Sequence, residues 1–246
     1  MTEPTKPNEN EEQRSAPEQT PPMQPIVDMG AVTTRTARGT VYCLTVVGQI
    51  EGHSLLPNTV KTTKYEHLIP QLIAVEENPK LRGLLVILNT MGGDVEAGLA
   101  LAEMIATLSK PTVSLVLGGG HSIGIPLATA TDYSFIAGTA TMTLHPIRTT
   151  GLVITAETTF DYMRKTQDRV IDFIAGHSRA TRKRVTELMN CSDNMSNDVG
   201  TILFGKEAVD AGIIDAVGGV SQALGELRRR VAKVDELEKE ISISTD

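Results

Sequence analysis

The sequence is poor in aromatic residues and in cysteine, and each shortage excludes a class of protein. Aromatic residues make up 3% of the 246 positions and tryptophan is absent, which argues against a protein that stacks nucleic-acid bases. The net charge of −7 argues against a broad phosphate-binding surface, so no nucleic-acid partner is expected. The two cysteines, Cys43 and Cys191, stand in no CxxC pair, so neither a zinc site nor a disulfide framework is predicted.

Long apolar runs are missing as well. No stretch of about 18 apolar residues occurs, so no transmembrane segment is predicted. The first residues contain no apolar core of a signal peptide, and we therefore expect a cytoplasmic protein. A GxxxxGK[ST] motif is also lacking, so any ATP-driven unfoldase of the AAA+ kind would be a separate chain.

Composition divides the chain into three parts. Residues 1–25 hold six of the twelve prolines and five glutamates, so they are predicted to be a disordered, acidic, proline-rich tail. Residues 26–219 are predicted to form one folded domain. Residues 220–246 are predicted to be a C-terminal amphipathic helix and tail. The apolar stripe of that helix can dock on its own domain or on a neighbouring subunit, and docking on its own domain is favoured.

Strand and helix patterns alternate through the first half of the folded part, which predicts an α/β fold with mostly parallel strands. The expected strands are 40–47, 84–88, 113–117, 133–137 and 141–144. The expected helices are 65–75, kinked at Pro70 or beginning near it, then 96–109, 123–130, 156–175, 180–189, 207–211 and 221–240, with a strand-like pair at 213–214.

Gly120–Gly124 has the sequence GHSIG and matches the GxSxG motif. In such motifs a strand turns sharply into a helix, and small neighbours allow the serine to stand exposed on a strained turn. Ser122 lies between an expected strand and an expected helix, so it is a candidate nucleophile. The alternative is a glycine-rich turn whose serine only caps the helix.

A second glycine-rich turn, Asn89–Gly93, also follows a buried strand and precedes a helix. Ligands of parallel α/β sheets gather at the carboxyl ends of the strands, and glycines there let backbone approach a ligand closely. The two turns are therefore expected to face one cleft. The alternative is that both loops contain glycine only because they turn tightly.

Of the five histidines, His145 is the candidate general base, because it ends a short apolar strand and precedes a proline. His121 is adjacent to Ser122 in the sequence. Its side chain is expected to point away from the serine hydroxyl, so it is a poor candidate for the base.

At these residues the sequence resembles the family of the Clp protease proteolytic subunit (ClpP), from about Cys43 to Val217. Several ordered blocks carry the resemblance, where each alone would be weak. They are 48–51 (GQIE), 77–79 (ENP), 89–98 (NTMGGDVEAG), 120–124 (GHSIG), 145–146 (HP) and 207–215 (EAVDAGIID).

The resemblance implies a ClpP/crotonase-like fold of repeated β/α units with a projecting helical handle at about 152–189. It implies a serine endopeptidase without a cofactor, in which Ser122 attacks a peptide carbonyl and His145 accepts its proton. The backbone N–H groups of Gly93 and Ile123 would form the oxyanion hole. Peptides or unfolded chains would be the substrates, and the subunits would assemble into stacked homo-oligomeric rings.

The sequence departs from the family pattern at the third catalytic residue. An ungapped alignment places Gly200 where the family has an aspartate, and Asp198 is the nearest acidic candidate. A dyad, with a backbone carbonyl or a water orienting the imidazole, is the alternative. Met91 also replaces a usual proline. These departures are similar to a divergent branch, the translocation-enhancing proteins (TepA), which implies a link to preprotein translocation or processing.

Three other functions compete with the peptidase. The missing aspartate motivates a catalytically weak or inactive ring-forming scaffold that binds preproteins. A Ser/Lys peptidase would use Lys165, in the expected handle, as its base. A crotonase-like acyl-CoA enzyme would use a carboxylate and would have no need of a GxSxG serine followed by a histidine.

Overall fold

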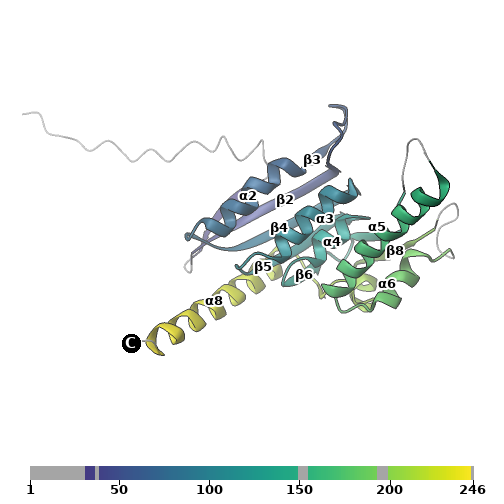
Figure 1. Cartoon of the computed structure of the whole chain (residues 1–246). Coiled ribbons are helices and arrows are strands. Elements are labelled where there is room, and N and C mark those ends of the chain that lie inside the picture. The colour runs from purple at the N-terminus through teal and green to yellow at the C-terminus, as the bar shows by residue number, and fades with distance from the viewer. Residues whose placement is uncertain (1–30, 37–38, 149–154, 193–198, 245–246) are drawn as a thin grey trace, which may run out of the picture.

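A computed structural model of the protein describes residues 31–36, 39–148, 155–192 and 199–244. The expected disordered tail at 1–25 and the candidate Asp198 lie outside these residues. Within them the chain forms an α/β fold around one twisted sheet (Figure 1). The predicted α/β fold class is therefore confirmed.

Six strands run across the sheet in the order β1-β2-β4-β5-β6-β9. All neighbours along this path pair in parallel except β1 with β2. The strands are β1 (Ala31–Thr36), β2 (Gly39–Glu51), β4 (Leu81–Gly93), β5 (Thr112–Gly120), β6 (Tyr133–Ile136) and β9 (Ala216–Val217). Three short strands lie off the path. They are β3 (Thr62–Lys64), beside β2, and β7 (Thr141–Leu144), which joins β5 to β8 (Thr201–Phe204).

The central strand β4 shows why the sheet lies inside the fold. Leu84, Leu85 and Val86 are all fully buried, as expected of a parallel strand covered on both faces. At its far end Thr90 is in register with Gly120 of β5. This pairing brings the two glycine-rich turns to the same edge of the sheet.

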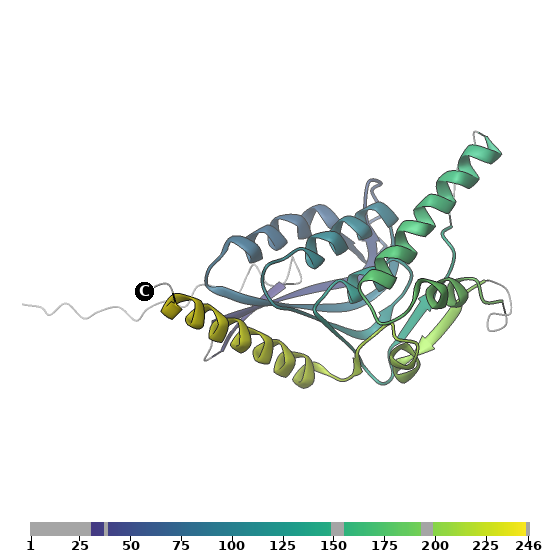
Figure 2. The same cartoon turned by 60° about the horizontal axis from the view of Figure 1, so that its bottom comes forward.

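Helices cover both faces of the sheet, as Figure 2 shows. One face carries α2 (Tyr65–Glu77), α3 (Val95–Ala106) and α4 (Gly124–Thr129), and the other carries α8 (Val220–Ser244). Pro70 lies inside α2, so the helix begins before the proline. The Asp94 side chain accepts a hydrogen bond from the Ala97 N–H at the start of α3, and it therefore fixes where β4 ends.

A long helix, α5 (Ala156–Gly176), leaves the sheet and projects outward (Figure 1). Its C-terminal half packs on α6 (Arg182–Met189) and contributes buried Val170 and Ile174 to the core. Both helices fall in the range expected for the handle. The short helix α7 (Gly205–Asp210) follows β8.

The C-terminal helix α8 docks on its own domain, as favoured from the sequence. Ala223, Leu227 and Val231 are buried against the sheet in the same cluster as Cys43 and Leu85. Beyond this cluster, Arg82 of β4 forms ion pairs with two carboxylates of α8, Asp235 at 2.5 Å and Glu238 at 2.9 Å. Apolar contacts and ion pairs thus both hold α8 against the sheet.

One strand assignment from the sequence is wrong. Ile213 and Ile214 form a bend, and the strand lies at Ala216–Val217. The N–H groups of both isoleucines donate to the Ala208 carbonyl, at 3.0 and 3.2 Å. They therefore close the end of α7 instead of pairing with a strand, although their side chains are buried as a strand pattern would suggest.

None of the helices in the described ranges combines the length and apolar content needed to span a membrane.

Leu227→Ala is predicted to destabilise the domain by about 2–5 kcal/mol, because it opens a cavity under α8. Leu227 is fully buried, and its side chain lies against Gly83. Denaturant unfolding measures the change. Leu237→Ala is the matched control, since Leu237 lies on the same helix with 49% of its surface exposed. Equal losses in the two variants would contradict the docking described here.

Candidate active site

Three strands bring the expected site residues together at one edge of the sheet. Gly119 of β5 pairs with Thr141 of β7. The Ser122 N–H donates to the Thr143 carbonyl at 2.8 Å, and the His121 N–H donates to the Thr90 carbonyl at 3.1 Å. The turn after β5 is therefore fixed between β4 and β7.

Ser122 occupies a strained turn between β5 and α4. Its φ is +55°, and no other non-glycine residue in the described part of the chain has a positive φ. The left-handed region costs an L-residue about 1–2 kcal/mol, and such strain concentrates at functional sites. The N-cap position of α4 is Ile123, without a side-chain cap. These features fit the exposed serine of a GxSxG turn and disagree with a serine that only caps the helix.

The end of β4 packs directly against this turn. Gly92 has a φ of +92°, and a Cβ there would lie 2.7 Å from the Ser122 Cβ and 3.4 Å from the Ile123 nitrogen. The Thr90 hydroxyl accepts from the Gly92 N–H at 3.0 Å and donates to the Gly48 carbonyl at 2.6 Å. Only glycine leaves room for the two backbones to approach this closely.

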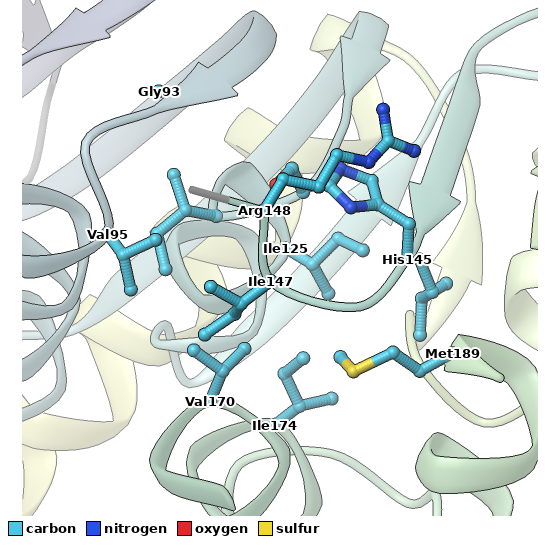
Figure 3. Close-up of a pocket in the computed structure, with 12 residues that line it drawn as sticks. Gly93, Val95, Ile125, His145, Ile147, Arg148, Val170, Ile174 and Met189 are labelled. Carbon is cyan, nitrogen blue, oxygen red and sulfur yellow. The ribbon is translucent and has the colours of Figure 1, made fainter. Parts of the chain in front are cut away.

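The N–H groups expected to form the oxyanion hole belong to residues of one cavity. Gly93 and Ile123 both line it, together with Ser122 and His145 (Figure 3). Within the residues that the structure describes, the Ile123 N–H has no hydrogen-bond partner. It therefore remains available to an oxygen atom bound in the cavity.

His145 follows β7 and lines the same cavity as Ser122. Its Nδ1 lies 2.7 Å from the Pro146 carbonyl oxygen. A carbonyl oxygen only accepts, so Nδ1 carries the hydrogen and Nε2 keeps its lone pair. This is the tautomer that a general base needs when it accepts a proton through Nε2.

Gly200 lies directly beside His145. Its φ is +138°, and a Cβ there would come within 2.3 Å of the Leu144 carbonyl oxygen and 3.0 Å of the His145 Cβ. The backbone at this position thus leaves no room for any side chain. A carboxylate acting on His145 cannot come from position 200 in this structure.

The cavity beside Ser122 is small and mainly apolar, with a volume of about 150 Å³. Aliphatic and methionine side chains form most of its wall: Val95, Ile125, Leu144, Ile147, Val170, Ile174 and Met189. A second cavity of about 290 Å³, between the start of α3 and α5, shares Val95, Ile147 and Arg148 with the first. The two cavities are therefore adjacent, and together they are called the groove. Arg148 and His145, both labelled in Figure 3, line the first of these cavities.

The other candidate bases lie elsewhere. The His121 ring makes a 2.9 Å hydrogen bond between Nδ1 and the Thr143 hydroxyl, and it does not line the cavity. Burial lowers the pKa of His121, and the charge of His145 lowers it further. Lys165 is exposed on α5 and is also absent from the cavity wall. No cluster of His, Cys, Asp or Glu in the described ranges is arranged to hold a metal ion.

Gly200→Asp is predicted to destabilise the protein by about 2 kcal/mol or more without improving the site, because the side chain collides with the strand that leads to His145. Denaturant unfolding and the rate of reaction with a serine-directed fluorophosphonate measure the two effects. Gly138→Ala is the control, since nothing lies within 4 Å of a Cβ at that glycine. A stable, faster-reacting Gly200→Asp protein would contradict the crowding inferred here.

Comparison with known proteins agrees with this geometry. The sequence model of the Clp protease family matches residues 39–221. The translocation-enhancing protein TepA of Halalkalibacterium halodurans is 58% identical over 193 residues, which is 78% of this chain and 75% of that protein. The ATP-dependent Clp protease proteolytic subunit of Streptococcus uberis is 24% identical over 175 residues, 66% of this chain and 82% of that subunit.

The matched region begins at β2 and ends at the start of α8, so it includes both glycine-rich turns, Ser122 and His145. The resemblance inferred from short blocks of sequence is confirmed. The chain belongs to the Clp protease family and is similar to its translocation-enhancing members.

Proposed function

We propose that this protein is a serine endopeptidase that hydrolyses peptide bonds in peptides or unfolded chains. One observation carries the proposal: a GxSxG serine with φ +55° opens into the same cavity as a histidine whose Nδ1 is hydrogen-bonded to a carbonyl. Membership of the Clp protease family supports it.

In the proposed mechanism the Ser122 hydroxyl attacks the substrate carbonyl carbon, and its proton passes to Nε2 of His145. The carbonyl oxygen becomes an oxyanion that accepts from the N–H groups of Gly93 and Ile123. His145 then gives the proton to the leaving amine. Water attacks the resulting acyl-enzyme in the same way, releases the acid and restores Ser122.

In this mechanism the Pro146 carbonyl orients the His145 ring, as a carboxylate does in a complete Ser-His-Asp triad. It fixes the ring and its tautomer, because it accepts the Nδ1 hydrogen. It carries no full negative charge, so it stabilises the imidazolium less than an aspartate would. We therefore propose a Ser-His dyad that reacts slowly. Asp198 remains the alternative third member.

The apolar cavity would hold the substrate side chain next to the bond that is cleaved. Its wall of aliphatic side chains favours an aliphatic residue and disfavours a positively charged one, because the wall includes Arg148 and, among the described residues, no carboxylate. The neighbouring cavity would bind the chain further along. Together they suit an extended or unfolded segment.

The proposed substrates, location, assembly and partner are inferred from the family and from the relatives. The name of the Halalkalibacterium halodurans relative links that protein to translocation, and we propose that the substrates here include preproteins, in the cytoplasm. Ring assembly of identical subunits is proposed through α5, where Phe160 and Tyr162 are 67% and 60% exposed. A separate AAA+ unfoldase would deliver folded substrates.

A catalytically weak or inactive scaffold that binds preproteins is the second candidate. Gly200 favours it, because the position that supplies the aspartate in the family is filled by a glycine. The scaffold would use the same groove for binding, and it would not require the Ser122 hydroxyl.

A fluorophosphonate probe is predicted to label the purified full-length protein at Ser122. Ser122→Ala should abolish labelling, and His145→Ala should slow it by about 10³-fold or more, because the serine loses its base. Mass spectrometry locates the adduct, and circular dichroism verifies folding. A folded wild-type protein that remains unlabelled would reject the peptidase in favour of the scaffold.

Asp198→Asn tests the third member. With the Pro146 carbonyl as the orienting group, the variant is predicted to react with the probe at the wild-type rate. If Asp198 orients His145 instead, the rate should fall by up to about 10⁴-fold. Asp210→Asn is the matched control, because Asp210 is exposed on α7 and pairs there with Lys206.

A further inference from the structure

The proposed dyad leaves His121 without a role, although this residue precedes the nucleophile. It is excluded as the base because its ring faces Thr143 and not the cavity. Its position nevertheless connects every strand that builds the site.

Two hydrogen bonds join the nucleophile turn to Thr143 of β7, one from Ser122 and one from the His121 ring. The Thr143 carbonyl accepts from the Ser122 N–H at 2.8 Å, and the Thr143 hydroxyl lies 2.9 Å from the His121 ring nitrogen Nδ1. The backbone of Thr143 is thus bonded to Ser122, and the side chain of Thr143 is bonded to His121. His145 follows Thr143 by two positions, so both bonds act on the segment that carries the base.

The ring is held on its other side as well. A Cβ on Gly119 would lie 2.5 Å from Nε2 and 2.7 Å from Cδ2 of His121, so this edge of the ring lies close to the backbone of β5. The His121 N–H donates to Thr90 of β4. Burial, and after it the nearby charge of His145, lowers the pKa of the ring.

We propose that His121 is a positioning residue, whose ring hydrogen bond to Thr143 fixes the spacing between the nucleophile turn and the strand that carries His145. The inference rests on the proposed function. Its physical basis is that proton transfer depends steeply on distance, so a displacement of about 1 Å can cost two orders of magnitude in rate. The ring transmits this effect without contacting the substrate.

The test measures the second-order rate of Ser122 labelling by a fluorophosphonate at pH 8 in the full chain. His121→Ala and Thr143→Val each break the hydrogen bond and should slow labelling at least about tenfold. The double variant should be no slower than the slower single variant, because both changes remove the same bond. His121→Asn, whose amide lies near the former Nδ1, should recover most of the rate.

A merely structural role would give a different pattern. His121→Ala would then lower the unfolding midpoint without changing the labelling rate of the folded protein. If the rate does fall in both single variants, effects that multiply in the double variant would show that the two residues act independently. Either result would overturn the proposal. His67→Asn is the matched control, because His67 is exposed on α2, away from the site.

A second readout does not depend on peptidase activity. In NMR spectra of ¹⁵N-histidine protein, Thr143→Val should shift the ring signals of both His121 and His145, because it removes the bond to the His121 ring and frees the strand that leads to His145. Unchanged His145 signals would overturn the positioning role. If Thr143→Val causes these shifts but the wild-type protein never reacts with the probe, the proposed function alone is rejected.

Discussion

The hydrogen bond from the Ser122 N–H to the Thr143 carbonyl is the contact on which the site geometry depends. It joins the turn after β5 to β7, a strand of only four residues that has one paired position with β5. Without this bond, β7 would be held mainly by β8, and His145 would have no fixed distance from the serine. The cavity that Ser122 and His145 share therefore depends on this junction.

The sequence predicted the centre of the fold better than its edges, and burial explains the difference. β4 and β5 are covered on both faces, so they appear as continuous apolar runs. Strands β1, β3 and β8 lie at edges or pair over only three to six residues. Their short, largely polar or mixed sequences, such as TTK in β3, resemble loops, because pairing with a neighbour rather than local propensity makes them strands.

The same distinction applies to the candidate site. The sequence identified Ser122 and His145 as candidates, Ser122 through its GxSxG turn and His145 through its place at the end of a short apolar strand before a proline. The Pro146 carbonyl, the contact of Gly200 with His145 and the His121–Thr143 bond are contacts through space. No periodicity or spacing encodes them, so the orienting group of His145 required the structure.

The strain at Ser122 bears on whether the site is a relic. A glycine would adopt the φ of +55° without the cost that a serine carries there, about 1–2 kcal/mol. The turn is held from both sides, by Thr90 through His121 and by Thr143, so the fold would tolerate that exchange. A serine that served only the turn would therefore be the less stable choice. A serine on a strained backbone and a histidine whose Nε2 can accept a proton line the same cavity. This combination favours the proposed Ser-His dyad over a groove that only binds.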